Sequence, residues 1–232
     1  RCDLFRSDYR GLVSDIGHDC QYEKFSDFKK ANFGTCAAAK NSGKGVILNV
    51  FKKLRKKIPF VIDCNRDMSR TVLLAGTGRS GTTWIAETIN YANQYRLIFE
   101  PFQSRKVPLV KHFKHGQYLR PECSLPEYIE PTQTILSGQV KNRWIDAHNA
   151  KFITSKRLIK TIHANLMLKW IKIHFPMVPI VFVLRHPFAV ADSRLSLSHW
   201  NWMEDFHECI SQDELIADYL GSVINRIHRA SN

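Results

Sequence analysis

The hydrophobic positions of this chain fall in short unbroken runs more often than in alternating patterns. One run is Val72 to Ala75, and a second is Val178 to Leu184. Unbroken apolar runs of this length are typical of strands buried on both faces, as in a parallel sheet that helices cover. A third run, Leu97 to Phe99, is followed by the acid Glu100. The pattern predicts a strand at each of the three runs.

Helical spacing occurs between these runs, most clearly from Asn165 to Phe175. The apolar residues there recur at helical intervals and predict an inward face of Leu166, Trp170 and Ile173. Strands separated by helices predict an α/β fold, a three-layer sandwich with a central parallel sheet. The 232 residues can bury one substantial core. We expect a single domain, in which residues 1–68 form a peripheral N-terminal segment and residues 69–232 the core.

A glycine-rich turn joins the first predicted strand to a helix. Its sequence is Gly76-Thr-Gly-Arg-Ser-Gly-Thr-Thr-Trp84. Glycines let the backbone turn sharply and approach an anion closely. The first N–H groups of the following helix point at such an anion, together with the positive end of the helix dipole. Because Arg79, Thr82 and Thr83 supply further donors, the segment predicts a phosphate-binding turn.

The turn matches one known phosphate-binding pattern and nearly matches another. A nucleoside-triphosphate loop needs a lysine after its last glycine, to reach the β and γ phosphates, and Thr82 stands there instead. This difference argues against a kinase. The dinucleotide pattern G-x-G-x-x-G is satisfied, and it expects an acid about 20 residues further on, at the end of a second strand. Glu100 provides that acid, so the turn alone leaves the ligand open.

A second anion site is predicted where the strand at residues 178–184 ends. Arg185 follows this strand, and Pro187 fits the first turn of a helix, where its missing N–H costs nothing. Ser193 lies about two helical turns after Arg185. An arginine at a strand end and a serine on the next helix can hold one phosphate by charge and by hydroxyl. The apolar face of this helix is expected to consist of Phe188, Ala191 and Leu195.

Together the two segments resemble the sulfotransferases that use 3′-phosphoadenosine 5′-phosphosulfate (PAPS), which include carbohydrate-type, tyrosylprotein-type and bacterial members. The signatures of that family are a strand-loop-helix of the form R/K-S-G-T-T and a later strand-arginine-helix-serine. Both occur here in that order between Thr71 and Arg194. Phe99-Glu-Pro101 also resembles a segment of carbohydrate-type and related members. The resemblance implies the P-loop-like sulfotransferase fold.

The resemblance also implies which residues bind the nucleotide. The first loop would hold the 5′-phosphosulfate through Arg79, Ser80, Gly81, Thr82 and Thr83, with Trp84 beside them. The second segment would hold the 3′-phosphate through Arg185 and Ser193. The implied reaction is in-line transfer of a sulfuryl group from PAPS to an acceptor hydroxyl, with a glycan or similar compound preferred and without a metal ion. Arg79 would stabilise charge on the bridging oxygen, because arginine stays protonated and does not donate a proton.

An acceptor hydroxyl also needs a base. Glu100 is the first candidate, because it follows the second strand at the same sheet edge as the loop, and several related sulfotransferases use a glutamate near this position. Cytosolic members use a histidine in a K-T-H segment, which Lys160-Thr-Ile-His163 resembles with one extra residue. In a strand, that residue would turn His163 to the opposite face, so His163 is the second candidate. Lys160 would reach the sulfate oxygens.

Each of these assignments has a structural alternative. Glu100 could pair with Arg105, His163 could be a core histidine, and Lys160 could pair with an exposed acid. Asp192 has no histidine or carboxylate at ligand spacing, so no metal site is predicted. Two alternatives concern the whole protein: a dinucleotide-binding oxidoreductase, in which Glu100 would hold a ribose, and a non-catalytic nucleotide-binding module.

Composition adds an expected partner. The net charge of +13 implies an anionic partner, and the nucleotide supplies part of it. Nucleic acid is not expected, because the chain has no zinc pattern, recognition helix or basic repeat interleaved with aromatics. Six cysteines without a C-x-x-C pair indicate neither a zinc site nor a thiol redox centre. We favour a cytoplasmic location, or the Golgi lumen if a leader or anchor has been removed.

Three further parts of the sequence lead to predictions. Gly45 to Pro59 is predicted to be a basic helix with a solvated face, and the alternative is an amphipathic helix lying on the domain or on a membrane. Residues 101–150 are expected to choose the acceptor through basic loops, broken by Pro108, Pro121, Pro126 and Pro131. The chain lacks the late glycine-rich basic loop that many members place over the nucleotide. The nucleotide site is therefore either closed in another way or incomplete at Asn232.

Overall fold

The computed structural model describes residues 61–149, 151, 153–197, 207–222 and 224. The chain separates into two units, residues 1–49 and residues 50–232, and every described residue belongs to the second. The basic helix predicted at 45–59 lies outside the described residues. So does most of the predicted peripheral segment at 1–68, and both stay predictions.

Parallel strands form the central sheet, in the order β3-β5-β2-β6. Their bounds are Thr71–Gly76 for β2, Arg96–Phe99 for β3, Arg157–Thr161 for β5 and Ile180–Val183 for β6. A separate parallel pair joins β1 (Ile62–Asp63) to β4 (Ile153–Thr154). The three strands predicted from apolar runs are confirmed as β2, β3 and β6.

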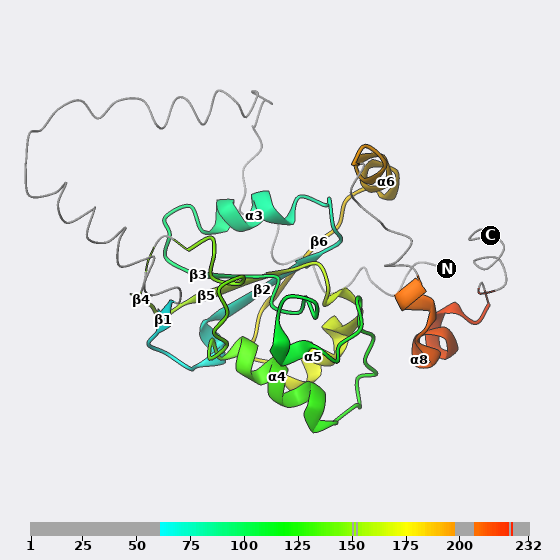
Figure 1. The fold of residues 1–232 in the computed structure, drawn as a ribbon, viewed down its shortest axis with the longest axis horizontal. Helices are drawn as coiled ribbons and strands as arrows, with labels where there is room; N and C mark the ends of the chain where they lie inside the picture. The colour runs from blue at the N-terminus through cyan, green and yellow to red at the C-terminus, as the bar shows by residue number, and fades with distance from the viewer. Residues whose placement is uncertain (1–60, 150, 152, 198–206, 223, 225–232) are drawn as a thin grey trace, which may run out of the picture. The chain divides into compact units, whose positions relative to one another are not determined.

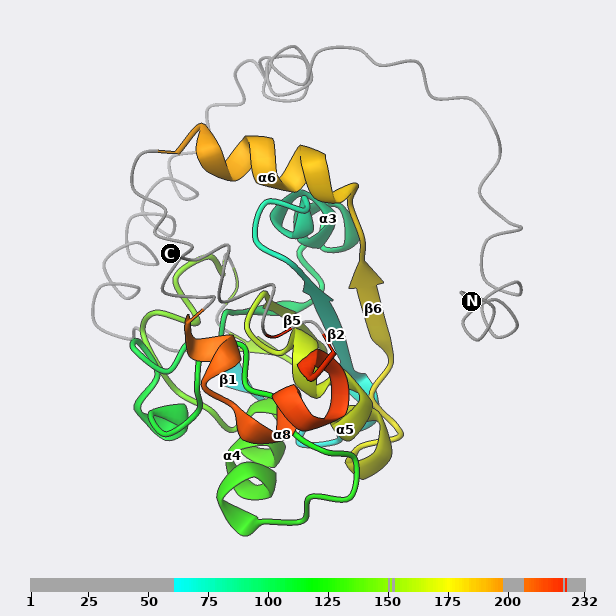
Figure 2. The ribbon, with the colours of Figure 1, turned by 90° about the vertical axis from the view of Figure 1, so that its right-hand side faces the viewer.

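Helices cover both faces of this sheet (Figure 1). The α3 helix lies on one face, and α4 and α5 lie on the other. Figure 2 shows α6 on the same side of the sheet as α3. The predicted α/β sandwich with a parallel sheet is thus confirmed. The helical elements are η1 Met68–Arg70, α3 Thr82–Ile89, η2 Pro108–Val110, α4 Pro126–Leu136, η3 Asn165–Met167, α5 Leu168–His174, α6 Pro187–Leu195, α8 Asp213–Leu215 and the π-helical η4 Ile216–Leu220.

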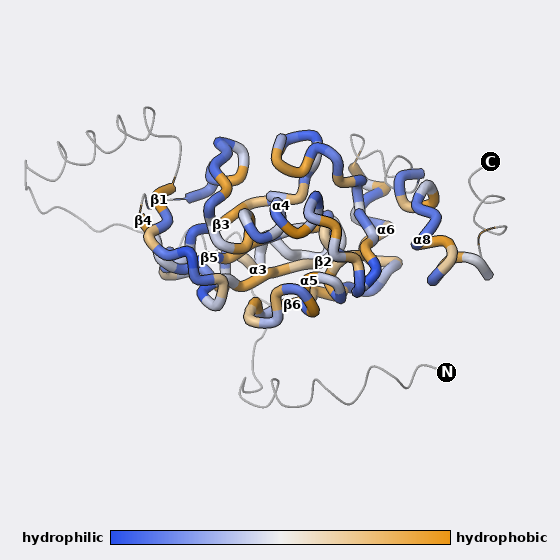
Figure 3. Tube along the Cα trace, turned by 90° about the horizontal axis from the view of Figure 1, so that it is seen from below, coloured by the Kyte–Doolittle hydropathy of each residue, from blue (hydrophilic) through white to orange (hydrophobic). Residues whose placement is uncertain are grey.

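The central strands send successive side chains to opposite faces, and both faces are apolar. In β2, Leu73 enters the larger core, which includes residues of α4 and α5, whereas Leu74 packs with Ala86 of α3 in a smaller one. In β5, Ile159 and Leu158 divide in the same way. Figure 3 shows the hydrophobic stretch along the middle of the sheet, with polar loops around it. Burial on both faces explains the unbroken apolar run of β2. In β6, Val181 and Phe182 are 39% and 46% exposed, so the prediction of burial on both faces was wrong for that strand.

Two predicted apolar faces differ from the structure. Trp170 is fully buried as expected, but Leu166 and Ile173 are exposed. The segment begins as the 3₁₀ turn η3 and continues as α5, so spacing that assumes one α-helix does not hold across the junction. On α6, Phe188 and Leu195 are 79% and 68% exposed, so the predicted apolar face is not covered by the described residues.

The prediction of a loop at Pro126 and Pro131 was wrong, because both prolines lie in α4. Pro126 stands in the first helical turn, where a missing N–H costs nothing. Pro131 lies inside the helix and cannot donate to the carbonyl of Glu127, four residues earlier. The His112 Nε2 lies 2.7 Å from that carbonyl oxygen and donates to it instead. A ring from another loop therefore satisfies the acceptor that proline leaves open.

Candidate functional site

The glycine turn after β2 has the tight geometry that its sequence predicts. A Cβ on Gly76 would lie 2.7 Å from Thr82 Cγ2 and 2.9 Å from the carbonyl oxygen of Val183, so the position has no room for a side chain. Gly81 has φ +94° and is the N-cap of α3. This left-handed conformation favours glycine. The turn therefore leads directly into the N-terminus of α3.

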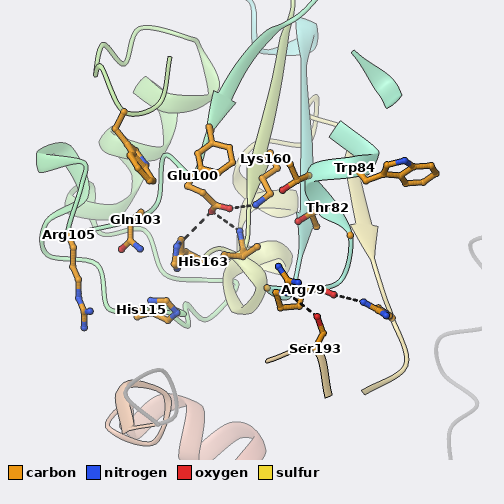
Figure 4. A pocket seen from close by; sticks show the side chains of 17 residues that line it. Arg79, Thr82, Trp84, Glu100, Gln103, Arg105, His115, Lys160, His163 and Ser193 are labelled. Carbon is orange, nitrogen blue, oxygen red and sulfur yellow. Dashed lines mark hydrogen bonds and ion pairs between the residues drawn. The ribbon is translucent and has the colours of Figure 1, made fainter. Parts of the chain in front are cut away.

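Arg79 connects this turn to the segment after β6. It has φ 71°, an uncommon conformation for a residue with a side chain. Its Nε donates to Ser193 Oγ at 3.0 Å, and its carbonyl oxygen accepts from Arg185 Nη1 at 3.0 Å. Figure 4 shows this contact between the two segments. The two predicted anion sites thus adjoin, although 106 residues separate Arg79 from Arg185.

Hydrogen-bond donors of the turn remain available to a ligand. Ser80 is buried, and its Oγ has no hydrogen-bond partner among the described residues. The N–H groups of the first turn of α3 have no partner within the helix. Thr82 is buried at the start of α3, whereas Thr83 and Trp84 are exposed. A helix N-terminus with the Thr82 and Thr83 hydroxyls in its first turn fits a phosphate or sulfate group.

A cavity of about 760 Å³ runs from this turn toward the ends of β3 and β5. This volume is within the range of ligand sites in proteins. Among the residues predicted to bind nucleotide, Ser80 alone does not line it. On the predicted nucleotide side, from the glycine turn to the segment after β6, the lining consists of Gly78, Arg79, Gly81, Thr82, Thr83, Trp84, Arg185 and Ser193. The remaining lining residues are Phe99, Glu100, Gln103, Arg105, His115, Trp144, Lys160, Ile162 and His163.

Glu100 lies at the centre of the cavity, immediately after β3, with φ 48°. Its side chain forms a buried ion pair with Lys160 Nζ, and its Oε2 accepts from the N–H of Ile162 at 2.9 Å. Burial raises the pKa of the Glu100 carboxyl, and the Lys160 charge and the Ile162 N–H offset part of that rise. A raised pKa is what a carboxylate needs to act as a base near neutral pH.

His163 lies on the same side as Glu100, so the prediction that it faces the opposite way was wrong. The β5 strand ends at Thr161, and strand alternation therefore does not extend to His163. Its Nε2 is 3.8 Å from Glu100 Oε2, and its ring centroid is 4.3 Å from that of His115. The residue is 5% exposed, which also agrees with the alternative of a core histidine. Both candidate bases thus line one cavity.

Lys160 pairs with a buried acid rather than an exposed one. Its Nζ also lies 4.9 Å from the centroid of the Phe99 ring. Glu100 therefore pairs with Lys160, whereas Arg105 Nη2 lies 3.4 Å from Glu208 Oε1. The alternative pairing of Glu100 with Arg105 is not the one that the structure has.

Several cavity residues were not found from the sequence. Trp144 is half-exposed and lies edge-on to Phe99, at 5.8 Å between ring centroids, and Gln103 follows Glu100 in a turn. Position shortly after Glu100 is the one signal that could have indicated Gln103. Arg105 and His115 belong to the region expected to choose the acceptor, but nothing in the motifs singled them out.

Among the described residues, no group of three or more His, Cys, Asp or Glu side chains could hold a metal ion. In the same part of the chain, no helix is both long and apolar enough to cross a membrane. The described thiols of Cys64 and Cys123 form no disulfide.

Searches against protein-family models, curated proteins and solved structures found no match. Any functional conclusion therefore rests on the residues of the cavity and their geometry.

Proposed function

We propose that the protein is a sulfotransferase with a P-loop-like fold, which moves a sulfuryl group from PAPS to a hydroxyl-bearing acceptor. The contact of Arg79 with both Arg185 and Ser193 carries this proposal, because it joins two anion-binding segments in one cavity. A nucleotide with phosphate groups at both its 5′ and 3′ positions is a ligand class that needs two such segments. A glycan or similar polyhydroxyl acceptor is preferred.

In the proposed reaction, the N-terminus of α3 and the Thr82 and Thr83 hydroxyls bind the 5′ end of the donor, and Arg185 and Ser193 bind its 3′-phosphate. As the acceptor oxygen bonds to sulfur, the bond from sulfur to the bridging oxygen breaks. Negative charge grows on that oxygen, and Arg79 stabilises it. Glu100 takes the proton of the acceptor hydroxyl.

Lys160 has two roles in this proposal. It holds the Glu100 carboxylate in place through the buried ion pair, and its charge lies at the point where the nucleotide side of the cavity meets the rest (Figure 4). An ammonium there favours the sulfuryl oxygens electrostatically. Lys160 would therefore support both the base and the transferred group.

A dinucleotide-binding oxidoreductase is the main alternative, and in it the Glu100 carboxylate would accept a hydrogen bond from a ribose. Glu100 instead forms an ion pair with Lys160. That alternative also leaves the contact of Arg79 with Arg185 and Ser193 without a function.

Calorimetric titration of the intact protein with adenosine 3′,5′-bisphosphate (PAP), the nucleotide product, tests the proposal. We expect wild-type binding, and Arg185→Gln should weaken it by about tenfold or more, because hydrogen bonds to charged groups contribute roughly 1.5–3 kcal/mol. Arg66→Gln is the matched control, since Arg66 is exposed and precedes β2 at the opposite end of the sheet. Binding of NAD without binding of PAP would overturn the proposal.

A non-catalytic module would bind PAP but transfer nothing. Transfer of labelled sulfate from PAPS onto glycans, phenols, lipids and tyrosyl peptides separates the two possibilities. Label on none of the four classes, with PAP bound normally, would favour the module.

A further inference from the structure

One side of the cavity is built by loops rather than by the sheet. Gln103, Arg105 and His115 lie away from Arg79 and Ser193, across Glu100 (Figure 4). They come from the turns after β3 and from the loop at 114–118, outside any strand or helix. We call these three residues the acceptor wall. Loop residues need support from elsewhere to hold a fixed geometry.

A single carboxylate contacts two members of the acceptor wall. Glu208 Oε1 lies 3.4 Å from Arg105 Nη2, and Glu208 Oε2 accepts a hydrogen bond from the backbone N–H of His115. Glu208 belongs to the helical residues 207–210 and follows His115 by 93 residues. The Glu208 carboxylate contacts the side chain of Arg105 and the main chain of His115. Replacing Glu208 therefore affects both loops together.

The segment that carries Glu208 has other attachments to the same loop. Lys114 Nζ donates to the Ser211 carbonyl at 2.9 Å, and Gln212 Oε1 accepts from the N–H of Tyr118 at 2.8 Å. Further along, Asp218 forms a hydrogen-bonded ion pair with Arg120, also at 2.8 Å. These bonds hold the segment on the loop without Glu208. A substitution at Glu208 should therefore leave the segment in place and change the acceptor wall.

We propose that Glu208 is a positioning residue for the acceptor, an inference that rests on the proposed function. By fixing the main chain at His115, Glu208 sets the His115 ring against His163, which in turn lies beside Glu100. By pairing with Arg105, it limits the orientations of a long exposed side chain. The acceptor wall then has a fixed geometry and orients the acceptor so that its hydroxyl faces Glu100. Displacing such a wall by about 1 Å can slow a reaction roughly a hundredfold.

The test compares Glu208→Gln with Glu214→Gln in the full-length protein. Glu214 makes a matched control, because it is on the same segment and also pairs with an arginine, Arg120, at 3.7 Å. Arg120 does not line the cavity. Three probe acceptors, a disaccharide, 4-nitrophenol and a tyrosyl peptide, are assayed with labelled PAPS. The KM is measured for the probe that accepts the most label.

For Glu208→Gln we expect the KM of that probe to rise by about tenfold or the kcat to fall by a similar factor. The Kd for PAP should stay unchanged, because Glu208 contacts none of the residues proposed to bind nucleotide. The ring signals of His115 and His163 in NMR spectra, assigned with His115→Gln and His163→Gln, should shift. Glu214→Gln should change neither the kinetics nor these signals.

Two results would overturn the positioning role: ring signals and kinetics of Glu208→Gln that match those of Glu214→Gln, or a weaker PAP affinity that accounts for the whole loss of activity. Failure of the proposed function looks different, because the wild type would then bind no PAP. The NMR comparison still tests the contact between Glu208 and His115 in that case.

Discussion

The strands β3 and β5 have a cluster of charged side chains at each end, and the two clusters are built on different principles. The strands begin with the register partners Arg96 and Arg157. At the other end, β3 finishes at Phe99, which lies opposite Lys160, and Glu100 follows it, whereas β5 continues to Thr161. One pair of strands therefore positions both a buried arginine cluster and the candidate site.

At the amino end, the charges are fully buried and closely matched by partners. Arg96 forms two hydrogen bonds with Asp146, at 2.8 and 2.9 Å, and donates to two backbone carbonyls. Arg157 bonds to Asp63, to Thr71 Oγ1 at 2.7 Å and to two further carbonyls. Neither arginine is exposed to solvent. Complete sets of partners are what buried ions need to offset their desolvation.

At the carboxyl end, the charged pair is smaller and borders a cavity. Glu100 bonds to Lys160 and to the Ile162 N–H, and a carboxylate has about four acceptor sites, so it keeps capacity for a substrate proton. Its backbone conformation is of a kind that costs on the order of 1–3 kcal/mol and that clusters at functional sites. In the proposed function, the difference means that buried charge supports the fold where its partners are complete, at the amino end, and serves chemistry where they are not, at Glu100.

The largest effect is expected from Glu100→Gln, which should reduce sulfuryl transfer by about 10²–10⁴-fold, the usual contribution of a general base. PAP binding should change little, because Glu100 is outside the nucleotide side of the cavity. Initial rates of labelled transfer and PAP calorimetry measure the two properties. Normal turnover in this variant, with a large loss in His163→Gln, would move the base to His163.

Substitutions at the amino ends of β3 and β5 should lower the free energy of unfolding more than substitutions at their carboxyl ends. Arg157→Met leaves Asp63 without its closest cation, and breaking a buried pair on one side typically costs 3–5 kcal/mol, so we expect a loss of about that size in the free energy of unfolding. Urea denaturation measures it. The control is Lys160→Met, which also removes one partner of a buried pair but does so beside the cavity, and it should cost less. Equal losses in the two variants would contradict the difference between the ends.

The smallest effect concerns pH. The proposed base acts when it is ionised, and burial raises the pKa of Glu100, so the acidic limb of kcat/KM should have its midpoint above the ordinary value for glutamate, about 4.3. Activity is then lost as the pH falls through the raised pKa. A pH profile of the wild type, compared with the residual activity of Glu100→Gln, checks this. A limb of the same midpoint in the variant would assign the titration to another group.

Local sequence predicted the parts of this molecule that depend on short segments. The strand, glycine turn and helix around Gly76, the strand end at Glu100 and the break at Arg185 were all recognisable, because apolar strand composition and turn geometry restrict the residue types there. Contacts between distant segments could not be predicted in this way. Glu208 bonds to His115 across 93 residues, and no periodicity connects them.

The error at His163 has a similar cause. Strand alternation predicts direction only as far as the strand continues, and nothing in Lys160-Thr-Ile-His163 shows that hydrogen bonding to the neighbouring strand ends at Thr161. The burial of Arg96 and Arg157 was not predicted, because each is the first residue of an apolar strand and its charge has no partner nearby in the sequence. Their partners, such as Asp63 and Asp146, lie far away in the sequence.

The shared register of β3 and β5 makes the number of residues in these strands a constraint on evolution and engineering. Deleting one residue from β3 would shift one end by about 3.3 Å relative to the other and turn the side chains beyond it to the opposite face. Either Arg96 would lose Asp146 or Glu100 would lose Lys160. Insertions and deletions should therefore not be tolerated within these two short strands, because their length sets the spacing between the arginine cluster and the candidate site.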